Sequence, residues 1–528
     1  MMTSLRGTGS LLRFILRRDR LRIALWVVGI TALVLSSASS IVGIYKTKEE
    51  LVQAAAVIND NPAVVAMNGP PQAVDTLGGR VAFEVGAFGF AVVGLMGMFL
   101  VGRHTRAEEE SGRSELMRAA VVGRHAPTTA ALIVAAATSV VLGAIVAFGL
   151  MAFDLPTAGS LAFGAALAGV GLVFAGVTAV VVQITEHTRA AYGITGAVLG
   201  IAYVVRAAGD VGDGTLSWLS PIGWAQAVRA FAIERWWVLM LFLATTAVLT
   251  YVSFALSARR DFGAGLLRPG PGSPTASSSL VRPVGLALRL QRASLMGWAA
   301  GLFLTGLAYG SVGKDIEDFV GDNKDLADML AQAGGNLTDS FFATALLILA
   351  LMAAGFAMQS TLRLRSEETA GRAEPVLATA ISRVRWAGSH LIVAAGGTIV
   401  IVAMAGLGAG LSYGLTIGDL SQVPRLMGAA LVHVPAVWAL IGVAIALFGL
   451  VPRATALAWA ALGVCVAIGF LGELLGLPDW VVGASPFDHV PQVPAVGVTF
   501  GPLLILSAVA AALAIAGLTA FRRRDAGY

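Results

Sequence analysis

The 528-residue chain has little charge and almost no cysteine. Only 13% of its residues are Asp, Glu, Lys or Arg, whereas 57% are hydrophobic; soluble domains are about a quarter charged. Cys465 is the single cysteine, which excludes a disulfide within the chain and any metal cluster built on cysteines. Together with a mean hydropathy of +0.80, this composition predicts an integral membrane protein.

Several signatures of chemistry are also missing. No G-x-x-x-x-G-K-[ST] string is present, since Lys314 in GSVGKDIEDF is followed by Asp315, so we expect no ATPase activity in this chain. The six histidines do not have metal-ligand spacing, and the basic residues are scattered rather than clustered with aromatics. We therefore expect no catalytic residues, no metal, no cofactor of the chain's own and no nucleic-acid partner.

What the chain does contain is a series of apolar runs long enough to cross a bilayer of about 30 Å. Because they lack strict alternation, we expect helices. The first, Ile23–Tyr45, is longer than the core of a signal peptide and is interpreted as a retained anchor. The twelve expected spans are 22–45, 80–102, 126–152, 159–183, 190–206, 236–256, 294–312, 338–362, 386–413, 424–450, 455–474 and 500–520.

The distribution of basic residues predicts an orientation. If the N-terminus is inside, 27 of the 36 lysine and arginine residues fall on the inner side, so the positive-inside rule places both termini in the cytoplasm. Residues 261–283, rich in Gly, Pro and Ser, are expected to form a flexible cytoplasmic linker. It separates a six-span half at 1–260 from another at 284–528.

The two halves repeat one plan. RRDRLRIALW in the first matches RLQRASLMGW in the second, and WLSPIGW is echoed by WVVGASPF. We expect an all-α polytopic protein made of two tandem six-helix halves. Because six is an even number, both halves have one orientation and should be related by a pseudo-twofold axis along the membrane normal.

A charged decapeptide also occurs twice. RAEEESGRSE begins at Arg106 and RSEETAGRAE begins at Arg365, and both read Arg-x-Glu-Glu-x-x-Gly-Arg-x-Glu. The register continues to Arg124, which matches Arg383. Each copy falls in the expected cytoplasmic loop between the second and third span of its half. We call these segments the first and second motif.

Two interpretations of the motifs are open. On a helix, an arginine, a glutamate and a second arginine, Arg106, Glu109 and Arg113 in the first copy, lie at i, i+3 and i+7 and form a ladder on one face. This suits a solvated helix, whose ion pairs add only about 0.2–0.5 kcal/mol each. However, a glycine within a helix, as at Gly112 and Gly371, costs about 1 kcal/mol and suggests a bend or a close backbone approach. We favour docking of a cytoplasmic partner.

The chain resembles the membrane subunit of ABC-2 type exporters, in particular the fused twelve-span permeases known as exporters of polyketide antibiotics and multidrug efflux permeases of actinobacteria. The resemblance rests on LLRFILRRDRLRIALW, RAEEESGRSE, the short EHTRAA and VPRATA segments, and WLSPIGWAQAVRAF. The second half departs from this pattern in SPFDHV, which lacks the Gly-Trp of SPIGW.

The resemblance implies a bacterial inner-membrane permease that expels hydrophobic drugs or antibiotics. It also implies that each motif is a coupling helix, and that two copies of a separate ABC ATPase subunit dock there and bind ATP and Mg. The implied coupling residues are Arg106, Glu108, Glu109, Gly112, Arg113, Glu115, Arg365, Glu367, Glu368, Gly371, Arg372 and Glu374.

Ionisable residues within spans suggest function by default. Glu84 and Glu473 lie near the outer ends of their spans, where interfacial carboxylates are favoured, and we expect His433 to bond a neighbouring helix rather than relay protons. Aromatics and methionines on the second span of each half could line a hydrophobic cargo pathway, although ordinary packing against lipid and neighbouring helices is slightly favoured. The pathway candidates are Phe83, Glu84, Phe88, Phe90, Met96, Met98, Phe99, Phe341, Phe342, Phe356 and Met358.

Two other functional classes fit less well. A proton-coupled carrier of major-facilitator type also has two six-span halves, but it would need more charge within its spans. A lipid-modifying enzyme would need paired carboxylates or a histidine cluster at a membrane face. The favoured hypothesis is an ATP-driven efflux permease.

Overall fold

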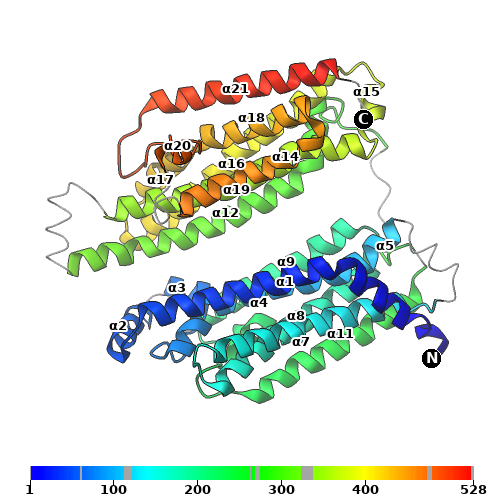
Figure 1. The fold of residues 1–528 in the computed structure, drawn as a ribbon, viewed down its shortest axis with the longest axis vertical. Coiled ribbons are helices and arrows are strands. Elements are labelled where there is room, and N and C mark those ends of the chain that lie inside the picture. The colour runs from blue at the N-terminus through cyan, green and yellow to red at the C-terminus, as the bar shows by residue number, and fades with distance from the viewer. Residues whose placement is uncertain are drawn as a thin grey trace. The chain divides into compact units, whose positions relative to one another are not determined.

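The structure is a computed structural model that describes residues 2–59, 62–111, 122–261, 263–267, 274–322, 337–471 and 478–524. Within these ranges the chain consists of helices, turns and loops and contains no strand. The expectation of an all-α chain is confirmed for this part. The chain divides into two compact units, Met1–Gly272 and Ser273–Tyr528 (Figure 1).

The described part of the first unit contains six long helices and several short ones. Its short elements are η1 (Met2–Leu5), α2 (Lys48–Asn59), α3 (Pro62–Asn68), α5 (Arg106–Glu110), η2 (Leu216–Leu219), α10 (Pro221–Ala227) and η3 (Trp236–Val238). The long helices are α1 (Thr8–Ile44), α4 (Leu77–His104), α7 (Ala126–Met151), α8 (Thr157–Ile184), α9 (Thr188–Val211) and α11 (Leu239–Arg259).

The second unit is built in a similar order. Its short elements are α15 (Ala373–Leu377), η4 (Pro452–Ala454) and α20 (Asp479–Val482). The longer helices are α12 (Pro283–Asp322), α14 (Leu337–Thr369), α16 (Arg383–Ile417), α17 (Gln422–Leu431), α18 (Val434–Leu450), α19 (Leu457–Leu471) and α21 (Phe500–Arg523).

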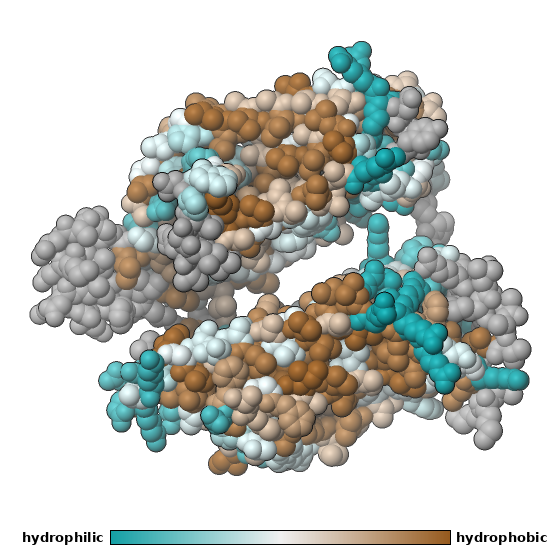
Figure 2. All heavy atoms as spheres, in the orientation of Figure 1, coloured by the Kyte–Doolittle hydropathy of each residue, from teal (hydrophilic) through white to brown (hydrophobic). Residues whose placement is uncertain are grey.

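Eleven segments of the described chain are long and apolar enough to cross a membrane. They match eleven of the twelve expected spans. The remaining one, 455–474, corresponds to α19, whose apolar part is shorter. On the face shown in Figure 2, hydrophobic side chains cover much of the middle of each unit and hydrophilic ones gather near the helix ends, as a surrounding bilayer favours. The span at 455–474, the cytoplasmic location of both termini and the twofold axis remain predictions.

Each unit has central helices that are mostly buried by their neighbours. In the first unit these are α4 and α8, whose most apolar windows are 72% and 78% buried, whereas the last helix, α11, is only 17% buried. In the second unit α14 is 72% buried and the last helix, α21, is again 17% buried. Small residues allow close contact: at Gly143 of α7 and Gly164 of α8, a Cβ on either residue would overlap the other's carbonyl oxygen.

The tenth span is interrupted. Residues 422–450 form two helices, α17 and α18, that meet at Val432 and His433. Pro435 stands in the first turn of α18, where its missing N–H costs nothing. The break therefore lies directly before the proline that marks the start of α18.

Candidate functional site

The two motifs adopt different local structures. In the first unit, Thr105 has φ −120° and ψ −87° and separates α4 from the short helix α5, which begins at Arg106. In the second unit, α14 continues without interruption from the apolar span through Arg365 to Thr369. Gly112, Arg113 and Glu115 lie outside the described residues.

In the first motif, Glu109 lies between two arginines. Its carboxylate is 2.6 Å from Nη1 of Arg106, three residues earlier, and 2.6 Å from Nη2 of Arg260, just after α11. A second Arg260 nitrogen donates to the same carboxylate at 2.9 Å, which makes this pair bidentate. The side chain of Arg106 is 1% exposed. A carboxylate held in this way is fixed within its own unit.

Arg106 also joins the motif to two other segments. Its Nε donates to the carbonyl of Glu186 at 2.7 Å, in the turn between α8 and α9. Its Nη2 donates to the carbonyl of Gly263 at 3.0 Å, in the segment after α11. Leu266 and Leu267 of that segment donate in turn to carbonyls at the end of α8. The start of the expected linker is thus hydrogen-bonded to the first unit.

The second motif has the same central arrangement. Nη1 of Arg365 lies 2.9 Å from Glu368, and the other side of this carboxylate lies 2.5 Å from Nη2 of Arg524, just after α21. In both units a further arginine binds the backbone of the second guanidinium residue: Arg124 donates to the carbonyl of Arg260 and Arg383 donates to the carbonyl of Arg524. Glu109 and Glu368 are therefore each held by two arginines from separate segments of their unit.

The predicted arrangement at i, i+3 and i+7 is confirmed for the i, i+3 pair and is wrong for the i+7 arginine of the second motif. Arg106 with Glu109 and Arg365 with Glu368 form the expected i, i+3 pairs. Arg372, however, pairs with Glu367 at 2.7 Å and not with Glu368, because α14 ends at Thr369 and the i+7 position leaves the helix face. The hydrogen bond that Arg372 donates to the Glu367 carboxylate raises the pKa of the Arg372 guanidinium.

Gly371 explains where this helix ends. Its φ is +68°, a left-handed conformation that favours glycine. Its N–H donates to the carbonyl of Glu368, and that of Arg372 donates to the carbonyl of Glu367, the two hydrogen bonds of a Schellman motif. A Cβ at Gly371 would meet nothing within 4 Å. Of the two expected reasons for the glycine, the bend is confirmed at this copy, and no backbone in the described part of this chain approaches the Cβ position closely.

The candidate coupling residues divide into held and exposed groups. Glu108 is held by Arg18 at 2.5 Å, and Glu367 is also held by Arg363 at 3.2 Å. Glu374 lies in the short helix α15 and is exposed, and the side chain of Arg372 is 53% exposed. The surface available to a partner on the second motif is thus its C-terminal part.

Buried polar residues beside the motifs were not predicted. Oδ2 of Asp19 in α1 lies 2.8 Å from Nε of Arg103 and 2.8 Å from Nε2 of His104, both at the end of α4. The sequence signal was a single acid within RRDRLR. Its partners could not be identified from spacing because they are more than 80 positions away.

The pathway candidates do not share one face. Phe90, Met96 and Met98 are buried in the core of the first unit, whereas Phe88 is 58% exposed and Phe99 packs against Trp26. In the second unit Phe342, Phe356 and Met358 are buried and Phe341 contacts Phe342. Most of these residues therefore serve as packing within a unit.

The three membrane-embedded polar candidates have different outcomes. Glu84 pairs with Arg80 at 2.7 Å, one turn away on the same helix, which suits an interfacial carboxylate. Nδ1 of His433 lies 3.3 Å from the carbonyl of Ala430, three residues back along its own span. The expected bond between helices is therefore replaced by a local bond at the break between α17 and α18. Glu473 lies outside the described residues.

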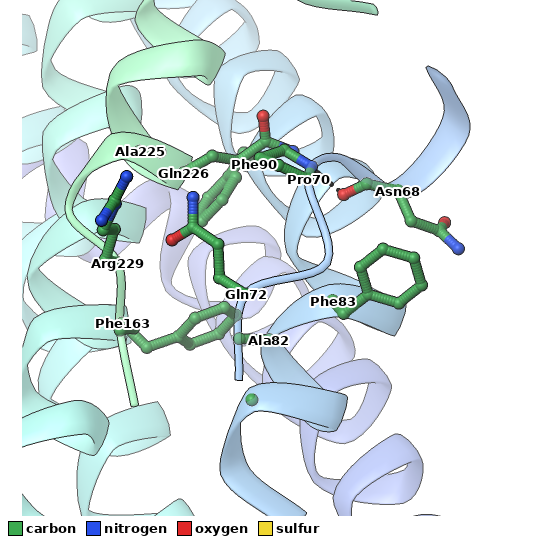
Figure 3. Close-up of a pocket in the computed structure, with 12 residues that line it drawn as sticks. Asn68, Pro70, Gln72, Ala82, Phe83, Phe90, Phe163, Ala225, Gln226 and Arg229 are labelled. Atoms are coloured by element: carbon green, nitrogen blue, oxygen red, sulfur yellow. Dashed lines mark hydrogen bonds between the residues drawn. The ribbon is translucent and has the colours of Figure 1, made fainter. Parts of the chain in front are cut away.

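A small cavity at the N-terminal end of α4 gathers aromatic and polar side chains (Figure 3). Its volume is about 40 Å³, room for about one water molecule. It is lined by Phe83, Phe90, Phe163, Gln72, Gln226 and Arg229 among others. Two pathway candidates, Phe83 and Phe90, meet here, but the space is too small for a drug.

Sequence reasoning also missed Arg206, which is 0% exposed within α9. Its guanidinium lies 3.2 Å from Asp210 and donates to the carbonyl of Met67 at 3.1 Å. Tyr203 donates to the same carbonyl at 2.6 Å. These side chains satisfy the C-terminal end of α3 and hold it against the bundle, so the buried charge has a structural explanation. Within the described ranges, no group of His, Cys, Asp and Glu could hold a metal ion.

Comparison with known proteins shows which family this chain resembles. A family model described as the C-terminal domain of the multidrug efflux system permease Rv1217c matches residues 280–522. The chain is also 46% identical over 523 residues to the multidrug efflux system permease protein Rv1217c of Mycobacterium tuberculosis. That alignment covers 98% of this chain and 95% of the relative.

Proposed function

The chain belongs to the family of multidrug efflux system permeases, and from this premise we propose that it is the membrane-spanning subunit of an ATP-driven ABC-2 type exporter of hydrophobic drugs. The observation that carries the proposal is the near full-length similarity to an efflux permease, in a chain whose charged motif recurs in both units. The protein would lie in the bacterial inner membrane with both termini in the cytoplasm.

The energy source would be a separate protein. The sequence has no phosphate-binding G-x-x-x-x-G-K-[ST] loop, so ATP and Mg would be bound by an ABC ATPase subunit. Two copies of that subunit are proposed because two motifs are present. On the second motif, Glu374 is exposed, and Arg372 is 53% exposed although it pairs with Glu367, so both offer charge to a docking surface. Glu368 is occupied by ion pairs within the unit.

The mechanism would use each unit as a lever. Closure of two ATPase subunits around ATP would move both motifs, and rigid-body rotation of the units would open a pathway outward. Cargo would have to bind the state before closure more tightly than the state after it, because only differential affinity can drive such a change. A large hydrophobic cargo fits a chain with so few ionisable residues in its spans.

The test is ATP-dependent uptake of a fluorescent lipophilic drug into inverted membrane vesicles that contain this chain and a co-expressed ABC ATPase subunit. We expect Glu374→Lys to reduce co-purification of the ATPase and drug uptake at least about fivefold, because it reverses an exposed charge at the proposed docking surface. Glu49→Lys, an exposed reversal in α2 on the expected outer side, is the matched control and should leave both unchanged.

Uptake that persists without the ATPase and follows a proton gradient would contradict the proposal and favour the carrier. Glu109 and Glu368 are poor probes of docking, because reversing either charge also breaks two ion pairs inside the permease.

A further inference from the structure

The last helix of each unit is followed by an arginine that reaches the motif. Arg260 comes directly after α11, and Arg524 comes directly after α21. Their guanidinium groups lie 2.6 Å from Glu109 and 2.5 Å from Glu368, and their side chains are only 8% and 16% exposed. We call each arginine, with its motif glutamate, a clamp.

The two clamps share a second contact. The carbonyl of Arg260 accepts a hydrogen bond from Arg124, and the carbonyl of Arg524 accepts one from Arg383. Arg124 and Arg383 are the residues that continue the register of the repeated motif. Each clamp arginine is thus fixed at its side chain and at its backbone by residues that flank the same loop.

The number of residues between the two members of the clamp differs between the units. Glu109 and Arg260 are 151 positions apart, whereas Glu368 and Arg524 are 156 positions apart. In both units the motif glutamate, its two arginine partners and the arginine that binds the backbone carbonyl therefore form the same contact, although the intervening segments differ in length. A charged contact that is kept in both copies of the repeat, across this difference in length, favours a shared role over incidental pairing.

The clamp matters most for the helices that carry it. α11 and α21 are the least buried spans of their units, each 17% buried over its most apolar window. Within a bilayer there is no hydrophobic driving force between helices, because lipid tails are as apolar as the neighbouring helices, so each of these two helices is held by van der Waals packing along one face. A charged tie at the helix end therefore contributes a larger share of what connects the helix to its unit.

We infer that Arg260 and Arg524 are positioning residues that tie the peripheral last helix of each unit to the motif, so that displacement of the motif carries α11 and α21 with it. The coupling part of this inference rests on the proposed function. Neighbouring arginines do not share the arrangement: Arg259 and Arg523 are exposed at the same helix ends, which makes them matched controls.

The first experiment needs no ATPase. Hydrogen exchange of backbone amides in residues 106–110 and 365–369 is measured on the full chain in lipid nanodiscs. We expect the double variant Arg260→Gln with Arg524→Gln to exchange about tenfold faster there, since a charge-assisted pair is lost. The control double variant, Arg259→Gln with Arg523→Gln, should match the wild type. Wild-type exchange in the clamp variant, or equal acceleration in the control, would overturn the inference.

The second experiment separates coupling from mere structure. Basal and drug-stimulated ATP hydrolysis are compared in complexes with the co-expressed ATPase subunit. The Gln double variant should keep basal turnover and lose most of the stimulation, and the Lys double variant should recover part of it, because lysine keeps the charge without the bidentate fork. Full stimulation in the Gln variant would overturn the positioning role. If the wild-type chain fails to associate with the ATPase, the proposed function fails, whereas the exchange measurement still decides the tie.

Discussion

At corresponding positions of their first helices, the two units bury polar side chains of different character. In the first unit Asp19 of α1 is 2% exposed and lies against Arg103 and His104. In the second, the register of the repeat places Gln291 of α12 there; it is 3% exposed, lies 3.2 Å from Nδ1 of His390 and accepts from Ser360 at 2.5 Å. One unit uses an ionic cluster where the other uses a neutral one.

This difference shows what the duplicated plan keeps and what it leaves free. Both copies keep a buried polar anchor on the first helix, and both keep the clamp. Charge at the anchor is specific to the first unit. The cost of losing an anchor should therefore differ between units, because an uncompensated buried charge is far more costly than an unpaired neutral group.

The largest effect is expected at the ionic anchor. Asp19→Ala should lower the free energy of unfolding by about 3–5 kcal/mol, since it leaves Arg103 and His104 without their shared carboxylate. Gln291→Ala should cost only about 1–3 kcal/mol, because it removes neutral hydrogen bonds. Denaturant unfolding in detergent micelles, followed by tryptophan fluorescence, measures both. Equal losses in the two variants would remove the distinction between the anchors.

A smaller contrast is expected between the first arginines of the two motifs. Arg106 is 1% exposed and donates to three backbone carbonyls as well as to Glu109. Arg365 is 26% exposed and pairs with Glu368. Arg106→Gln should therefore cost about 2–3 kcal/mol, and Arg365→Gln at most about 1 kcal/mol, in the same unfolding assay. A larger loss at Arg365 would mean that burial does not set the strength of these contacts.

The smallest effect concerns the helix end that distinguishes the second motif. Gly371→Ala should cost about 1 kcal/mol, because alanine resists the left-handed φ of +68°. Gly388→Ala, within α16 and with open space around its Cβ position, is the matched control and should be neutral or stabilising by up to about 1 kcal/mol. Thermal unfolding of the two variants side by side checks the sign of each shift.

The sequence was most informative where structure is local. Apolar runs placed eleven spans, and the i, i+3 spacing within the motifs identified the pairs made by Glu109 and Glu368. Such contacts depend on helix geometry alone. The repeat also matched Arg124 with Arg383. Each of them donates a hydrogen bond to the carbonyl of the arginine that follows the last helix of its own unit.

Long-range partners were beyond sequence reasoning. Arg260 and Arg524 lie more than 150 positions from their glutamates, and no periodicity connects them. Composition could not sort the pathway candidates for a related reason. A central helix such as α4 is apolar on all sides, so its sequence does not distinguish the buried Met96 from the exposed Phe88. The buried Arg206 was missed because it stood at the expected end of its span.

The interruption between α17 and α18 gives one span a mechanical property that an unbroken one lacks. The 17 residues of α18 make a rod about 26 Å long at about 1.5 Å per residue. Pivoting by about 10° at Val432 and His433 would swing the distal tip at Leu450 through about 4.5 Å, by the geometry of such a rod, while α17 stayed still. The uninterrupted α8 would have to tilt over its whole length to produce the same excursion.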